Sequence, residues 1–174
     1  MRDIVFDGEF YKGCIENYPG GESREIIYEV HGTCVFPIVG DKVLLIREQI
    51  PELGDVVKLP GGRVDGCWKG VEYCCSESHE EAAQRELFEE TGYKAGSLDL
   101  LFESLGSASI RQNQSCYLAR DCYESDEERQ IDSSEKIVVV PSLILGAIDL
   151  AWNGKLYVPH NHLVLLAGRR LGLT

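Results

Sequence analysis

The chain has 174 residues, of which 44% are hydrophobic and 26% are charged, and its formal net charge is −12. This composition is typical of a globular protein, and we expect one domain over residues 1–174. The excess negative charge argues against nucleic acid or an anionic membrane as a partner. No apolar run approaches the roughly 20 residues that cross a bilayer, and the N-terminus does not resemble a signal peptide, so we expect a soluble, cytoplasmic protein.

The N-terminal half predicts strands separated by turns rich in glycine and proline. The expected strands cover residues 3–14, 25–39, 42–47 and 56–59. YPGGES forms the first turn, and Gly40-Asp41 is expected to close a hairpin. Residues 63–76, which follow the Pro60-Gly61-Gly62 turn, are expected to be mostly loop.

A helix is predicted from Glu77 to Thr91. Ser78 and Glu81 have the S-x-x-E spacing of a capping box, and Gly92 suits the position at which a helix stops. Residues on one face of this helix form a stripe that is expected to face the core. They are Ala82, Ala83, Leu87 and Thr91.

The C-terminal half mixes strands with two further helices. Strands are expected at 98–105, 115–119 and 136–140, an acidic loop at 124–135, and helices at 142–153 and 161–171. Mixed strands with few helices predict an α+β fold, built as an α/β/α sandwich around a mixed β-sheet.

Seven cysteines in a chain of this size, without a secretory signal, indicate free thiols in a reducing compartment. Three of them, Cys67, Cys74 and Cys75, lie close together in the predicted loop. Their C-x6-C-C spacing is not a familiar zinc pattern, so the sequence does not predict a zinc site there.

Three glutamates on the predicted helix form an unfavourable pattern. Glu86, Glu89 and Glu90 have offsets of three and four residues, so their carboxylates stack on one helix face. Such repulsion costs about 0.2–0.5 kcal/mol per pair. A solvated surface is the ordinary explanation, but Arg85 lies beside them and a glycine turn precedes the helix. Since carboxylate and carbonyl oxygens are the ligands that Mg²⁺ prefers, a divalent metal site is the alternative.

The same residues resemble the signature of the Nudix hydrolases, G-x5-E-x7-R-E-U-x-E-E-x-G-U, where U is a bulky apolar residue. Gly62, Glu77 and the run from Arg85 to Tyr93 occupy its fixed positions. Fourteen residues separate Gly62 from Glu77 where the pattern has five, which indicates an insertion of nine. The resemblance implies an α/β/α sandwich that uses Mg²⁺ or Mn²⁺ to hydrolyse the pyrophosphate of a nucleoside diphosphate linked to another group.

The resemblance also implies roles for individual residues. The carboxylates of Glu86, Glu89 and Glu90 and the carbonyl of Gly61 would bind the metal, while Arg85 and Glu77 would orient them. A general base can come from a later loop in this family. Glu128 and Glu135 are the candidates for this base, and Glu135 is the one included among the predicted catalytic residues.

The N-terminal segment, residues 1–30, precedes a core of residues 31–174. It resembles the extra strands of ADP-ribose and nucleotide-sugar pyrophosphatases, which implies a homodimer. A proline that many ADP-ribose enzymes carry beyond the signature is absent here, where residues 107–111 read SASIR. The N-terminal strands favour ADP-ribose or a nucleotide sugar as the substrate, and the missing proline leaves the choice between them open.

Five residues are candidates for substrate contact, one of them as a second choice. An aromatic face stacks on a base, which favours Trp68, with Tyr28 as a second choice. Arginine suits bidentate contact with phosphate, which favours Arg47 and Arg111, and Gly62 allows close approach of backbone to a ligand. A non-catalytic nucleotide sensor with the same fold remains the alternative to an enzyme.

Overall fold

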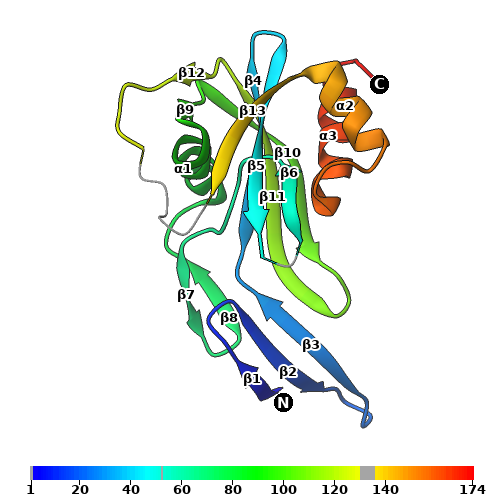
Figure 1. Ribbon diagram of the computed structural model, residues 1–174. Coiled ribbons are helices and arrows are strands. Elements are labelled where there is room, and N and C mark those ends of the chain that lie inside the picture. Colours follow the sequence, from blue (N-terminus) through cyan, green and yellow to red (C-terminus); the bar gives the residue numbers. More distant parts are fainter. Residues whose placement is uncertain (1, 52, 130–135) are drawn as a thin grey trace.

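The computed structural model describes residues 2–51, 53–129 and 136–174. Within these residues most strands join one mixed sheet of nine strands (Figure 1). Its strands are β1 (Arg2–Asp7), β2 (Tyr11–Asn17), β3 (Ser23–Glu29), β4 (Gly32–Val39), β5 (Lys42–Ile50), β6 (Gly54–Lys58), β10 (Ser97–Gly106), β11 (Ile110–Arg120) and β13 (Ile137–Leu143).

The sheet is mixed because β11 runs parallel to two of its neighbours. The order is β1-β2-β3-β11-β4-β5-β13, with β10 paired to β11 and β6 paired to β5. The pairs β11–β3 and β11–β4 are parallel, whereas the other strand pairs described in this sheet are antiparallel. The predicted hairpin at Gly40-Asp41 is present between β4 and β5.

Helices cover both faces of the sheet core. Figure 1 shows α1 (His79–Thr91) on one side and α2 (Ile144–Trp152) with α3 (Val158–Arg170) on the other. Each side has its own apolar core: Ala83 and Leu87 of α1 pack with Val35, while α2 and α3 pack over Phe36 and Leu118. This arrangement confirms the predicted α/β/α sandwich.

The strands β1, β2 and β3 extend away from this core and form a lower lobe with a separate hairpin (Figure 1). The hairpin consists of β7 (Gly66–Lys69) and β8 (Glu72–Cys75), so the prediction of a loop at 63–76 was wrong. Trp68 of β7 fastens it to the lobe, since its Nε1–H donates to the carbonyl of Glu9 at 2.7 Å. Two short strands, β9 (Tyr93–Lys94) and β12 (Tyr123–Glu124), pair beside α1.

Several predicted boundaries need correction. The strands predicted at 3–14 and 25–39 are each split in two, around residues 8–10 and 30–31. The first helix begins at His79, not Glu77, because Ser78 caps it; the capping box and the left-handed Gly92 are confirmed. The last helix begins at Val158, earlier than predicted, because Pro159 fits the first turn, where its missing N–H costs nothing.

No helix among the described residues is both long enough and apolar enough to cross a membrane.

Candidate active site

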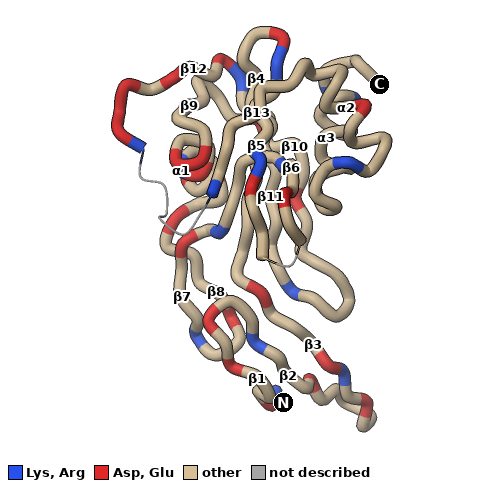
Figure 2. Tube along the Cα trace, viewed as in Figure 1, with Lys and Arg blue, Asp and Glu red and all other residues tan. Residues whose placement is uncertain are grey.

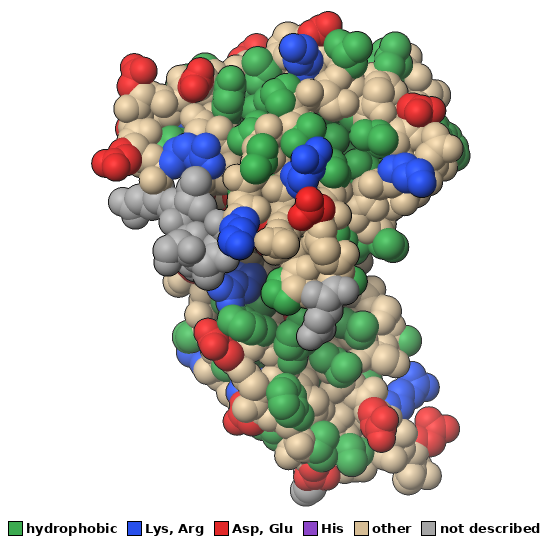
Figure 3. Space-filling view, in the orientation of Figure 1, with side chains coloured by type: hydrophobic (Ala, Val, Ile, Leu, Met, Phe, Trp, Pro, Cys, Tyr) green, Lys and Arg blue, Asp and Glu red, His purple; other side chains and the backbone are tan. Residues whose placement is uncertain are grey.

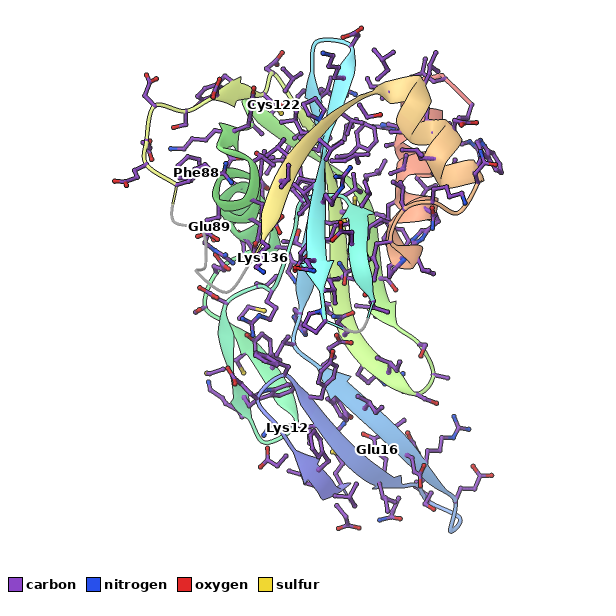
Figure 4. All side chains as sticks on the ribbon, in the orientation of Figure 1. Lys12, Glu16, Phe88, Glu89, Cys122 and Lys136 are labelled. Carbon is purple, nitrogen blue, oxygen red and sulfur yellow. The ribbon has the colours of Figure 1, made fainter. Side chains whose placement is uncertain are left out.

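Helix α1 presents its glutamates at the boundary between core and solvent. Its core-facing stripe contains the predicted apolar residues, and Glu90 is buried with them at 4% exposure. The side chain of Glu86 is 14% exposed and that of Glu89 is 32% exposed. The three carboxylates are therefore buried to different degrees. They do not form a uniformly solvated helix face. Figure 2 shows the acidic residues gathered on α1, and Figure 4 labels Glu89 among them.

Arg85 holds the outer carboxylates together. Its Nη1 donates to Glu86 at 2.9 Å and to Glu89 at 3.0 Å, and its Nη2 donates to Glu77 at 2.7 Å. The same Nη2 also donates to the carbonyl of Arg63 at 2.9 Å. The hydrogen bonds from Arg85 are the main reason why the pKa of Glu77 is lowered. One guanidinium thus joins α1 to the segment that precedes the hairpin.

The Pro60-Gly61-Gly62 turn lies directly against α1. The backbone N–H of Gly61 donates to Glu90 Oε2 at 2.7 Å. Gly61 has φ 150°, and a Cβ there would lie 2.3 Å from the carbonyl oxygen of Thr33. A Cβ on Gly62 would lie 2.4 Å from Glu86 Oε1. Gly61 therefore requires glycine, because it approaches backbone closely, whereas a Cβ on Gly62 would displace the end of the Glu86 side chain.

Sequence reasoning missed Lys58, which pairs with Glu90, and His160, which contacts the residue before the turn. Lys58 Nζ lies 2.7 Å from Glu48 Oε2 and 3.7 Å from Glu90 Oε1. The N–H of Leu59 donates to His160 Nδ1 at 2.9 Å, which ties the turn to α3. Burial lowers the pKa of His160 to about 3, so its imidazole is neutral and accepts this bond. Lys58 is far in sequence from Glu90, and His160 is far from Leu59, so no local sequence pattern predicts these contacts.

Sequence reasoning also missed a cation at the C-terminal end of α1. Arg129 Nη2 donates to the carbonyl of Glu90 at 2.8 Å, and its Nε donates to the carbonyl of Glu89 at 3.3 Å. These carbonyls belong to the last helical turn, which lacks intrahelical donors. Arg129, which lies midway along the predicted acidic loop, thereby attaches this loop to α1. Glu128 beside it is exposed, and Glu135 lies outside the described residues.

Among the described residues, the acidic cluster contains more carboxylates than cations in ion pairs with them. We use this name for Glu48, Glu77, Glu86, Glu89 and Glu90. Lys58 and Arg85 are the cations that make the described ion pairs with these five carboxylates. A concentration of oxygen donors with surplus negative charge is the chemistry that a divalent cation such as Mg²⁺ requires.

The predicted substrate-binding residues lie in different places. Trp68 and Arg111 line one open cavity of about 530 Å³, together with Tyr28 and His31. Gly62 lies instead at the acidic cluster, against Glu86. Arg47 is exposed in the middle of β5, between β6 and β13, and is not among the residues lining that cavity.

Residues 63–65 connect the cavity region to the acidic cluster. The carbonyl of Arg63 accepts from Arg85, while its guanidinium lies 4.2 Å from the ring centroid of Phe10. Arg63 and Asp65 line a second cavity of about 420 Å³, which shares Trp68 and Tyr73 with the first. The N–H of Asp65 donates to Glu77 at 2.8 Å. The lower lobe and the acidic cluster are therefore joined through a short, hydrogen-bonded segment.

Comparison with known proteins agrees with this geometry. Residues 30–152 match the model of the NUDIX domain. The chain belongs to the Nudix family. It is a hydrolase that cleaves pyrophosphate bonds, and Nudix hydrolases need divalent metal ions.

Two relatives extend the comparison beyond the Nudix domain itself. The chain is 26% identical over 163 residues to an ADP-ribose pyrophosphatase of Bacillus subtilis (strain 168), which covers 90% of this chain and 83% of the relative. A crystal structure of an ADP compounds hydrolase superposes with a TM-score of 0.75 at 21% identity, covering 100% of this chain and 95% of the other. The second similarity supports the fold, including the lower lobe.

Proposed function

We propose that this Nudix hydrolase cleaves the pyrophosphate of ADP-ribose or of a closely related ADP derivative. One observation carries the proposal: Glu86 and Glu90 lie against the Pro60-Gly61-Gly62 turn, and Arg85 links Glu89 to Glu86. The similarity over 90% of the chain to an ADP-ribose pyrophosphatase supports the choice of substrate. Nucleotide sugars are the second class of substrate for the same site.

Glu86, Glu89 and Glu90, together with the carbonyl of Gly61, are the residues that would hold Mg²⁺ or Mn²⁺. Their donors are oxygens, which both ions accept, and each carboxylate oxygen has more than one lone pair available. When bound, the metal polarises the phosphorus–oxygen bonds and lowers the pKa of a bound water. Arg85 is a positioning residue in this proposal, because its guanidinium holds Glu86 and Glu89 in place.

The reaction adds water across the phosphoanhydride. The water oxygen forms a bond to one phosphorus, the bridging P–O bond breaks, and the bridging oxygen leaves on the other phosphate. A base must take a proton from the water, and Glu128 and Glu135 remain the candidates for it. With ADP-ribose the products are AMP and ribose 5-phosphate.

The cavity of about 530 Å³ is the proposed place for the adenosine or the ribose. Trp68 packs edge-on against Tyr73, with ring centroids 5.1 Å apart, which holds its ring in a fixed orientation. Arg111 lines the same cavity and would meet a phosphate or a ribose hydroxyl. Arg47 lies outside this cavity, so any contact that it makes with a phosphate is made elsewhere.

The test is a substrate panel with the full-length protein. ADP-ribose, nucleotide sugars, dinucleoside polyphosphates and nucleoside triphosphates are each assayed with Mg²⁺ and with Mn²⁺, and the products are separated by chromatography. We expect AMP and ribose 5-phosphate from ADP-ribose at the highest kcat/KM. If no compound in the panel is hydrolysed with either ion while calorimetry detects ADP-ribose binding, the nucleotide-sensor alternative replaces the enzyme.

We also propose a homodimer in the cytoplasm, formed through the lower lobe. Apolar side chains of β1 are exposed there, with Val5 at 65% and Phe6 at 58%, and Figure 3 shows apolar atoms spread over this lobe. Exposed apolar area of this kind favours association. Light scattering at micromolar concentration tests the proposal; a monomer would contradict it.

A further inference from the structure

Three side chains with metal-ligating atoms converge beside the start of α1. His31 lies between β3 and β4, Cys75 is the last residue of β8, and His79 is the first residue of α1. One ligand atom from each lies within 4.8 Å of the other two. Cys75 Sγ is 3.3 Å from His31 Nδ1, and the two imidazole centroids are 5.7 Å apart. Three separate segments of the chain thus supply two nitrogens and a sulfur to one point.

A second layer of hydrogen bonds orients His79. Its Nδ1 lies 2.8 Å from Ser115 Oγ, and the Ser115 hydroxyl donates to Thr33 Oγ1 at 3.2 Å. A hydroxyl has one proton, so Ser115 accepts from Nδ1–H and Nε2 of His79 keeps its lone pair. Histidines that bind metals almost always donate their other ring N–H in this way.

We propose that His31, Cys75 and His79 bind one borderline-soft divalent transition-metal ion, with Zn²⁺ the best fit, and that the ion fastens the β7–β8 hairpin to α1. Imidazole and thiolate are the ligands that Zn²⁺ selects. With Zn–S near 2.3 Å and Zn–N near 2.0–2.1 Å, tetrahedral ligand atoms lie about 3.3–3.6 Å apart. The sulfur–nitrogen distance of 3.3 Å already lies in this range, and the other pairs, which are within 4.8 Å, need to close by at most about 1.5 Å. The exposed Cys75 allows this movement.

Three protein ligands leave the fourth position for water or a bound group, as in zinc sites that are open to solvent. His31 also lines the cavity of about 530 Å³, so the ion would lie at the edge of that cavity. The insertion between Gly62 and Glu77, which contains the hairpin, would then have a structural purpose. It would bring Cys75 to the two histidines.

This site is separate from the acidic cluster. Cys75 and His79 flank Glu77 in sequence, but the Glu77 carboxylate turns to Arg85 and to the N–H of Asp65. The acidic cluster offers oxygens, which suit Mg²⁺, whereas this site offers nitrogen and sulfur. Burial raises the pKa of the Cys75 thiol, with Cys74 and Glu77 adding to it, so a bound metal must displace the thiol proton. An experiment can therefore show that this metal site is absent without bearing on the proposed hydrolysis, and the reverse is also true.

The sequence did not predict this site because its ligands have no familiar spacing. The neighbouring cysteines also provide matched controls. Cys67 and Cys74 are Cα partners across the hairpin, and successive side chains of a strand point to opposite faces. Cys74 therefore lies on the opposite face of β8 from Cys75. Replacing it changes the same hairpin without removing a proposed ligand.

The experiment uses the metal-free full-length protein in excess Mg²⁺, which occupies carboxylate sites. Co²⁺ is titrated in, and absorbance is recorded for the visible bands of tetrahedral cobalt and the near-ultraviolet thiolate charge-transfer band. Zn²⁺ affinity is then measured against a chromophoric chelator. We expect one bound ion per chain with a thiolate band, and the Cys74→Ser control should retain both.

The ligand variants decide the assignment. Cys75→Ser should lose the thiolate band, and His79→Gln should lower Zn²⁺ affinity by at least about tenfold, as should Ser115→Ala through the orientation of His79. Circular dichroism checks that each variant is folded. Independently of any variant, Zn²⁺ should slow alkylation of Cys75 in the wild-type protein and leave that of Cys67 unchanged. A wild-type protein without the band, a band that persists in Cys75→Ser, or no protection of Cys75 would each overturn the proposal.

Discussion

The backbone N–H of Gly61 donates to the carboxylate of Glu90 at 2.7 Å, joining the glycine turn to the buried face of α1. Glu90 is 4% exposed, and Lys58 lies 3.7 Å from its other oxygen. A buried carboxylate is costly unless it is hydrogen-bonded and paired, and these contacts supply both conditions. The hydrogen bond from Gly61 thus places the glycine turn against the helix that carries Glu86 and Glu89.

Gly61 and Gly62 should respond differently to alanine. In Gly61→Ala, a Cβ meets the Thr33 carbonyl and the backbone is left at a positive φ, so we expect a loss of about 3 kcal/mol in the free energy of unfolding. In Gly62→Ala, the Cβ meets the movable end of Glu86, so stability should change by less than about 1 kcal/mol while the hydrolysis rate falls at least about tenfold. Urea unfolding and product release measure the two effects. Equal stability losses in both variants would argue against this distinction.

Arg85→Lys should impair hydrolysis while keeping the charge. A lysine cannot reproduce the planar fork that contacts Glu77, Glu86 and Glu89 together. We expect kcat to fall by about tenfold or more, with a change in unfolding free energy of about 1–2 kcal/mol. Arg120→Lys is the matched control, because Arg120 makes an exposed pair with Asp99 and should change stability by less than about 0.5 kcal/mol. An unchanged kcat in Arg85→Lys would remove the positioning role.

His160 should make stability depend on pH. Burial lowers its folded-state pKa to about 3, whereas an unfolded histidine has a pKa near about 6.5. Between these values the unfolded chain binds a proton that the folded chain does not, so stability is lost as pH falls, by up to about 1.4 kcal/mol per pH unit. His160→Gln should flatten this slope in urea unfolding between about pH 7 and about pH 5. His162→Gln, at an exposed position of the same helix, should keep the wild-type slope; equal slopes in all three proteins would disprove the assignment.

Local patterns predicted the glutamates and the glycine turn of the candidate site, whereas its remaining contacts are long-range. The capping box at Ser78, the stop at Gly92 and the glutamate spacing depend on neighbours within one or two turns, so the sequence carries them. Lys58 meets Glu90, and Leu59 meets His160, only because the sheet brings distant segments together. Hairpin β7–β8 was missed because GCWKGVEYCC has no regular alternation of apolar and polar residues, and its register depends on contacts such as Trp68 with Glu9.

The most direct test of the account compares wild-type protein with Glu90→Gln in AMP release from ADP-ribose at saturating Mg²⁺. Glutamine keeps an acceptor for the Gly61 N–H but lacks the negative charge, so the fold should remain while the rate falls by about a hundredfold or more. Glu80→Gln, on the first turn of the same helix and outside the acidic cluster, should keep the wild-type rate. A near-normal rate in a folded Glu90→Gln protein would contradict the claim that these carboxylates hold the ion that hydrolysis requires.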